Sequence, residues 1–88
     1  NAVFKILFDS DGSEIYLKPI GNYWNEGEEV CFYDMVERAF EYQETAIGYR
    51  RMSEQDSIER NFGIVLNPII DKVIPFTSKD YLIVLALN

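Results

Sequence analysis

The stretch that decides the fold is FYDMVERAFEY, residues 32–42. Apolar side chains recur in it at the i, i+3, i+4, i+7 and i+8 spacing of one helix face. These residues are Phe32, Met35, Val36, Ala39 and Phe40. Charged residues fall on the opposite side. The pattern therefore predicts one main amphipathic helix that buries a single face.

Four segments around this helix carry strand patterns. Residues 14–20 and 45–51 alternate between apolar and polar side chains, and residues 63–66 form a short apolar run. Residues 81–87 are apolar on both faces, which is typical of a central strand. The order β-α-β-β-β predicts an α+β fold. We expect a two-layer sandwich in which the helix covers a mostly antiparallel four-stranded sheet.

The N-terminal segment, residues 1–11, is predicted to be a linker outside the domain. Residues 3–8 are expected to form a short leading helix, because the polar turn that follows contains Gly12 and resembles a helix stop. Residues 12–88 then form one domain, since 88 residues allow only one small core. The chain begins without Met and ends abruptly, and we interpret it as a piece of a longer protein.

Composition argues against several function classes. The chain has 15 acidic and 8 basic residues, a net charge of -7, which opposes binding to nucleic acid or to an anionic membrane surface. No apolar run approaches the roughly 20 residues that span a bilayer, so no membrane insertion is expected. The lack of His and the single Cys31 exclude imidazole catalysis, an internal disulfide and a multi-Cys zinc site.

Cofactor and metal motifs fail on their spacing. The glycines give neither a dinucleotide fingerprint nor a P-loop. Residues 9–14 resemble the start of a calcium loop, but Glu14 stands where that loop needs Gly, and Ile20 where it needs Glu. The acidic residues at 26, 28 and 29 could hold a hard cation, although a solvated loop is the favoured interpretation. We therefore predict no metal and no cofactor within this chain.

The sequence does not predict an enzyme. Without His, the Ser, Cys and Lys side chains lack the usual partner that activates a nucleophile. A carboxylate enzyme would need a pocket that joins two of Glu14, Glu26 and Asp80, and nothing in the sequence favours one.

Aromatic residues are numerous for so small a domain, at 15% of the chain. Core packing is the favoured explanation, and Tyr23 and Trp24 are expected to fold from their loop over the core. A small domain cannot hide every ring, so some should face a partner. The dimer-interface candidates lie on the predicted helix: Phe32, Tyr33, Val36 and Phe40.

Five stretches carry a family resemblance: GSEIYLKP at 12–19, FYDMVERA at 32–39, ETAIGYR at 44–50, LNP at 66–68 and SKDYLIVL at 78–85. The most specific pieces are AIGY at 46–49 and NP at 67–68, followed by Asp80 before an apolar strand. In this order they resemble the C-terminal part of Castor/Pollux-type ion channel proteins. More distantly, they resemble the C-terminal lobe of RCK domains, which regulate potassium conductance, and of Trk-type potassium uptake regulators.

The resemblance implies a cytoplasmic, ligand-sensing regulatory lobe of a potassium or other cation channel. Such lobes form homodimers and follow a Rossmann-like lobe, which would bind a nucleotide such as NAD. The expected partners are that upstream lobe and the membrane pore domains of the parent protein. A ligand that prefers one conformation would shift the pore equilibrium.

The sequence departs from the family pattern at two places. Cys31 stands where the family tends to have a small hydroxyl residue, and residues 52–61 form a longer loop, which could alter a nearby ligand pocket. No residue matches a ligand motif of the family, although Arg50, Arg51 and Lys72 could cluster. The alternative function is a small-molecule-binding allosteric module of a soluble enzyme.

Overall fold

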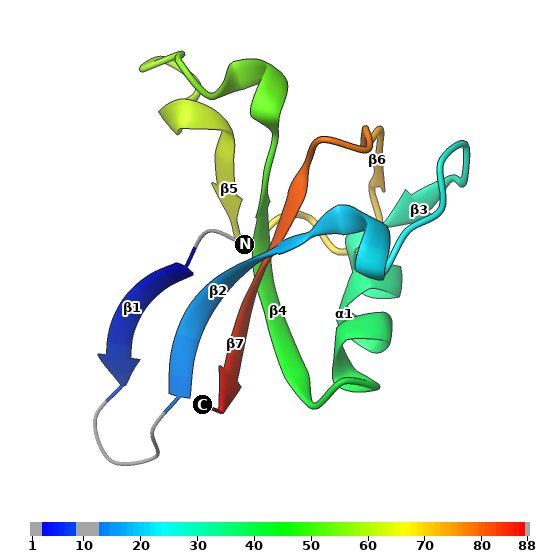
Figure 1. The fold of residues 1–88 in the computed structure, drawn as a ribbon. Coiled ribbons are helices and arrows are strands. Elements are labelled where there is room, and N and C mark those ends of the chain that lie inside the picture. Colours follow the sequence, from blue (N-terminus) through cyan, green and yellow to red (C-terminus); the bar gives the residue numbers. More distant parts are fainter. Residues whose placement is uncertain (1–2, 9–12, 88) are drawn as a thin grey trace.

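The computed structural model describes residues 3–8 and 13–87, and within them an α+β fold (Figure 1). A single α-helix, α1 (Phe32–Phe40), packs against an antiparallel sheet. In sheet order its five strands are β1 (Val3–Phe8), β2 (Ser13–Pro19), β7 (Tyr81–Leu87), β4 (Glu44–Arg50) and β5 (Ile64–Leu66). A second, two-stranded sheet pairs β3 (Val30–Cys31) with β6 (Val73–Ile74). Short 3₁₀ helices span Ile20–Asn22, Met52–Glu54 and Asn61–Gly63.

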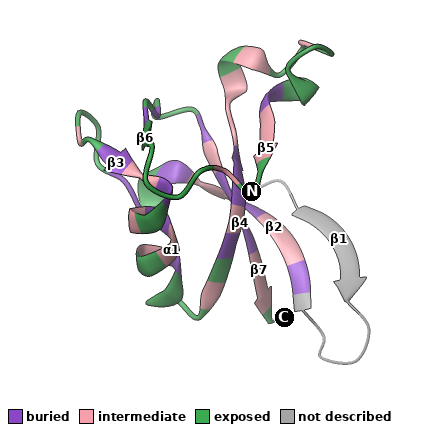
Figure 2. Cartoon of the chain, turned by 180° about the vertical axis from the view of Figure 1, so that it is seen from behind, coloured by how far each residue is buried: buried purple, intermediate pink, exposed green. Residues whose placement is uncertain are grey.

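Strand β7 occupies the middle of the sheet, as its two apolar faces predicted. It pairs along its whole length with β2 on one side, and from Tyr81 to Ala86 with β4 on the other. Leu82, Ile83 and Val84 are buried although they point alternately to the two faces. Figure 2 shows buried residues in the middle of the sheet, along β4 and β7.

The prediction of a leading helix at residues 3–8 is wrong. These residues form strand β1, which pairs antiparallel with β2 from Val3↔Tyr16 to Phe8↔Ser13. Six residues are too few to form a stable helix on their own, whereas the free edge of β2 satisfies their backbone groups directly. The sheet therefore has five strands instead of four. The turn and calcium-loop candidate at residues 9–12 lie outside the described residues.

Helix α1 confirms the predicted apolar face with one exception. Phe32, Met35 and Ala39 are buried in the core, and Val36 is half-buried against it. Phe40 is 77% exposed. At about 100° per residue, Phe40 lies on the flank of the face centred on the three buried residues. It is also the last helical residue, so no further turn shelters it.

The loop after β2 supplies aromatic rings to the core, as the sequence predicted. Tyr23 and Trp24 are both buried, and the Trp24 indole Nε1 donates a 2.8 Å hydrogen bond to the carbonyl of Glu28. The ring of Phe76 makes edge-to-face contacts with Trp24 and with Tyr49, at centroid distances of 6.3 and 5.4 Å. These rings close the end of the core beyond the helix N-terminus.

A β-bulge in β4 breaks the alternation predicted for that strand. Ala46 lies opposite Val84, but Gly48 lies opposite the adjacent residue Ile83, so Ile47 is the extra residue. The bulge lets both Ala46 and Tyr49 face the helix side, although they are three positions apart. The predicted alternation would have placed them on opposite faces.

Gly48 allows β5 to approach β4 closely. A Cβ at this position would lie 2.2 Å from the Val65 carbonyl oxygen and 3.1 Å from the Leu66 Cα. Both neighbours are backbone atoms, so they cannot move aside as a flexible side chain would.

We predict that Gly48→Ala lowers the free energy of unfolding by about 1–3 kcal/mol, because the strands must separate to accept the methyl group. Gly21→Ala is the matched control, since a Cβ there meets nothing within 4 Å. Urea unfolding curves give both values. Equal effects of the two variants would contradict the close approach of β5.

Candidate functional site

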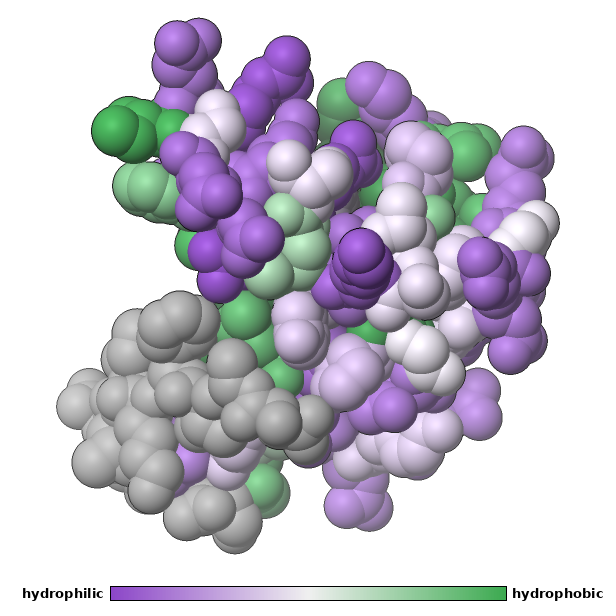
Figure 3. All heavy atoms as spheres, turned by 45° about the horizontal axis from the view of Figure 1, so that its top comes forward, coloured by the Kyte–Doolittle hydropathy of each residue, from purple (hydrophilic) through white to green (hydrophobic). Residues whose placement is uncertain are grey.

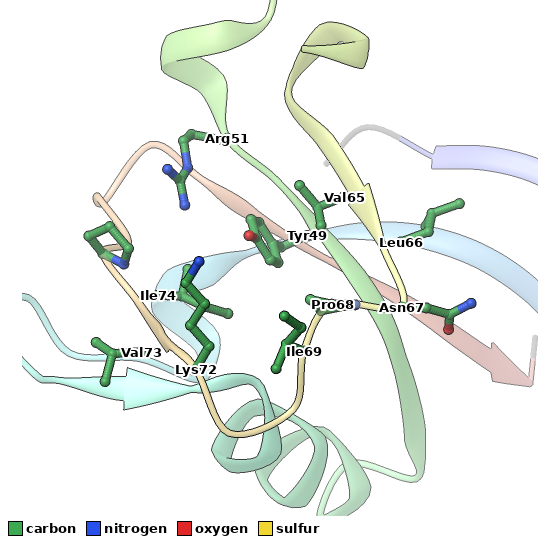
Figure 4. Close-up of a pocket in the computed structure, with 11 residues that line it drawn as sticks. Tyr49, Arg51, Val65, Leu66, Asn67, Pro68, Ile69, Lys72, Val73 and Ile74 are labelled. Carbon is green, nitrogen blue, oxygen red and sulfur yellow. The ribbon is translucent and has the colours of Figure 1, made fainter.

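A cleft with a volume of about 440 Å³ opens between β5 and the connector that leads to β6 (Figure 4). The end of β4 forms its floor, and β5 and residues 67–75 form its walls. Its lining residues are Tyr49, Arg51, Val65, Leu66, Asn67, Pro68, Ile69, Lys72, Val73, Ile74 and Pro75.

Left-handed backbone at both ends of β5 shapes this cleft. Asn61, Phe62 and Gly63 have φ values of 53°, 57° and 82°, which turn the chain back toward β4. The Arg51 amide then donates a 2.8 Å hydrogen bond to the Gly63 carbonyl. After β5, Asn67 has φ 51° and directs the chain away from the sheet edge. Asn61, Gly63 and Asn67 are of residue types that tolerate this conformation, whereas the bulky Phe62 adopts it at a cost in backbone strain.

Two basic side chains from different segments reach this cleft. The Arg51 guanidinium lies 5.7 Å from the centre of the Tyr49 ring, a cation–π contact that holds it over the floor. Lys72 is exposed on the opposite wall. In Figure 4 the two cationic ends point toward one another. Neither forms an ion pair with a carboxylate in the described part of the chain.

The cleft confirms part of the predicted basic cluster. Arg51 and Lys72 meet there, but Arg50 does not, because its Nε donates to the Phe62 carbonyl at 3.0 Å. The sequence did not predict the apolar walls. The signal for them was Asn67-Pro68 followed by an Ile- and Val-rich connector, but only the folded chain shows that this connector lies opposite Arg51.

The four dimer-interface candidates occupy different environments. Phe32 is buried in the core and Val36 is half-buried, whereas Tyr33 and Phe40 are 50% and 77% exposed. Tyr33 and Phe40 are seven residues apart, so they lie two turns apart on one side of α1.

The carboxylates considered for catalysis do not share a site. Glu14 is buried near the start of β2 and accepts a 2.9 Å hydrogen bond from the Tyr16 hydroxyl. Asp80 precedes β7, at the other end of the β2–β7 pair. Glu26 is exposed in a loop.

Asp80 has a structural role that the sequence did not indicate. Its side chain is 2% exposed, and its two carboxylate oxygens accept hydrogen bonds from the Met52 and Thr77 amides at 3.0 and 2.9 Å. Its carbonyl accepts a third bond from the Ile20 amide. The residue therefore ties three chain segments together at one end of the sheet.

One carboxylate of the acidic loop at residues 26–29 is neutralised by an arginine of helix α1. Glu28 binds the Arg38 guanidinium through both carboxylate oxygens, at 2.8 and 2.7 Å. Hydrogen bonds from Arg38 are the main cause that lowers the pKa of Glu28 to about 2. Arg38 also donates to the Tyr23 carbonyl at 2.7 Å, so the pair fastens the loop to α1. Among the described residues, no group of three potential metal ligands gathers here or elsewhere.

Comparisons with known proteins converge on ion channels. No family model matches the chain. It is 36% identical over 87 residues to "Probable ion channel POLLUX" of Arabidopsis thaliana and 34% identical over 88 residues to "Ion channel DMI1" of Medicago truncatula, in each case over 98% of this chain. "Ion channel POLLUX" of Lotus japonicus is 40% identical over 58 residues, 66% of this chain.

The chain spans about a tenth of the length of the first two relatives, 10% and 9%, and 6% of the third. All three are named as ion channels and none as an enzyme, in agreement with the prediction of a non-enzyme. In the described part of the chain, no helix is long and apolar enough to cross a bilayer.

We predict that Asp80→Asn lowers the free energy of unfolding by about 1–3 kcal/mol, because one buried amide would face a donor instead of an acceptor. Asp56→Asn, at an exposed position, is the control and should have little effect. Thermal and urea unfolding measure the difference. Similar losses in both variants would show that the Asp80 bonds do not matter for stability.

A second prediction concerns acid stability. The folded-state pKa of Glu28, about 2, lies below its ordinary value of 4.5. The stabilisation by this pair is therefore complete above about pH 4.5 and is lost as the pH falls toward 2. In urea titrations at pH 6 and pH 3, Glu28→Gln should reduce the acid-induced loss of stability. Glu26→Gln should leave that loss nearly unchanged, and a pH profile unaffected by Glu28→Gln would refute the assignment.

Proposed function

Across 98% of its length this chain is homologous to the Castor/Pollux-type ion channel proteins, and from that premise we propose that it is the regulatory domain of a potassium or other cation channel. In this role it senses a ligand on the cytoplasmic side and forms a homodimer. Its partners are the upstream nucleotide-binding and pore domains of the parent protein. Any nucleotide, such as NAD, binds the upstream domain and not this chain.

The observation that carries the ligand-sensing part is the cleft between β5 and the connector. It is open and has apolar walls, and it presents Arg51 and Lys72 without a described acidic partner. Pockets of this kind, mostly apolar with a few polar groups, are typical of small-molecule sites.

Regulation requires the ligand to favour one arrangement of the domain. The floor and the walls of the cleft differ in their support. The floor strand β4 pairs on both sides, whereas one wall, β5, is a three-residue edge strand and the other, the connector, lies outside the main sheet. A ligand that contacts both walls would fix their separation. If dimers or the neighbouring domains prefer that separation, ligand affinity and channel state become coupled.

The dimerisation part is supported by the outer side of α1. Tyr33 and Phe40 expose aromatic surface there, and the Ile70 carbonyl, from a half-exposed residue, accepts a 2.9 Å hydrogen bond from the Tyr33 amide. On the face seen in Figure 3, hydrophobic residues form separate patches between polar ones. An exposed aromatic stripe on such a surface suits a partner of the same kind.

We predict that the chain self-associates at micromolar concentration and that Phe40→Ser raises the dissociation constant about tenfold or more, as loss of an aromatic anchor does. Tyr33→Ser should act in the same direction. Ile58→Ser is the matched control, because Ile58 is 79% exposed but lies in the loop between β4 and β5. Sedimentation velocity measures all four proteins. A species of 10.3 kDa alone would refute dimerisation by the isolated chain.

A further inference from the structure

The lining of the cleft between β5 and the connector indicates the charge and shape of its ligand. We propose that this cleft binds a small organic anion in which a phosphate or carboxylate group is attached to an apolar body. Arg51 and Lys72 hold the anionic group, and the apolar walls hold the body. This inference rests on the proposed ligand-sensing function and adds the chemical class of the ligand.

The charge pattern of the cleft is opposite to that of the chain. Acidic residues outnumber basic ones 15 to 8 in the sequence, yet the lining has two basic residues and no acidic one. Three other basic side chains are neutralised within the fold, since Lys18 pairs with Glu44, Arg38 with Glu28, and Arg60 with Glu54. Arg50 and Lys79 form no ion pair among the described residues either, but neither lines the cleft. Two like charges that face one another repel, and an anion between them removes that repulsion.

The geometry around Arg51 suits a planar or tetrahedral anionic group. Its guanidinium is held against the Tyr49 ring, so the donors of its planar fork are pre-oriented instead of free to rotate in solvent. Guanidinium forks match phosphate and carboxylate oxygens in pairs, whereas the Lys72 amine adds a point charge from the other wall. The Tyr49 hydroxyl also lies at the cleft in Figure 4 and has no hydrogen-bond partner among the described residues.

The rest of the lining selects for an apolar body. Val65 comes from β5, Pro68 and Ile69 from the connector, and Val73 and Ile74 from β6. In Figure 4, Val65, Pro68 and Ile69 lie on the side of the cleft away from Lys72. A volume of about 440 Å³ lies within the range of small-molecule pockets, so the cleft has room for a ring system as well as the anionic group.

The test is an amide NMR titration of the 88-residue chain with 1-naphthyl phosphate, which combines a flat apolar body with a phosphate. Two further probes separate the contributions: inorganic phosphate has the charge without the body, and 1-naphthylmethylammonium has a similar body with the opposite charge. We expect 1-naphthyl phosphate to shift the amides of Arg51, Val65 and Lys72. Inorganic phosphate should bind about tenfold or more weakly, and the ammonium probe should not shift these amides.

Variants locate the anion-binding groups. Arg51→Gln and Lys72→Gln should each weaken the binding of 1-naphthyl phosphate by roughly tenfold, which is typical of losing one charge-assisted contact. Lys79→Gln is the matched control, because it removes the same charge from an exposed position outside the cleft, and it should leave the affinity unchanged. Lys72 is exposed on the connector, so its variant tests the site even if Arg51→Gln disturbs folding.

Several outcomes would overturn the proposal. It fails if the ammonium probe binds as well as the phosphate, if the shifted amides lie away from the cleft, or if Lys79→Gln weakens binding as much as Lys72→Gln. Sedimentation velocity with and without 1-naphthyl phosphate tests self-association separately from anion binding. Self-association without probe binding refutes the anion site and leaves the dimer intact, whereas cleft binding that leaves association unchanged supports the anion site and counts against ligand-controlled dimerisation.

Discussion

The pairing of β7 on both of its edges is the constraint on which the rest of the structure depends. Because β2 and β4 both bond to it, β7 is central in the sheet, and the buried side chains of Leu82, Ile83 and Val84 show that its middle is covered on both faces. Helix α1 then covers one face through Phe32, Met35 and Ala39. Asp80, immediately before β7, anchors the end of the strand to two neighbouring turns and to the loop after β2. The sheet, the helix packing and the Asp80 hydrogen bonds therefore all depend on the position of β7.

The cleft follows from irregularities placed next to this regular centre. The bulge at Ile47 turns Tyr49 toward the core, where its ring forms the floor of the cleft. Gly48 allows β5 to lie close to β4, and the left-handed residues at both ends of β5 return the chain as a wall facing that floor. Such departures from ideal strand geometry commonly occur beside functional sites. Here they bring a buried ring, two cations and an apolar wall to one place.

The electrostatics of the molecule divide into paired and unpaired groups. The Glu28–Arg38 pair lies outside the cleft, where it fastens a loop, while Arg51 and Lys72 have no described acidic partner. In an acidic protein, unpaired cations in a cleft oppose the average field, which attracts cations and repels anions over long range. An anion is therefore repelled at long range and is bound only when it contacts the two cations directly.

The sequence by itself determined the α+β class, a helix beginning at Phe32 and the central position of β7, because periodicity and composition are local properties. It failed at residues 3–8, where a short apolar run has no decisive period and the free edge of β2 selected a strand. It also failed at Phe40 and Ile47, where small rotations decide which side chains are covered. The sequence named Arg50, Arg51 and Lys72 as a possible cluster, but only the tertiary structure decided which of them share a cleft and that its walls are apolar. Arg51 and Lys72 are 21 positions apart, and chain reversals through left-handed residues bring their segments together where no local pattern connects them.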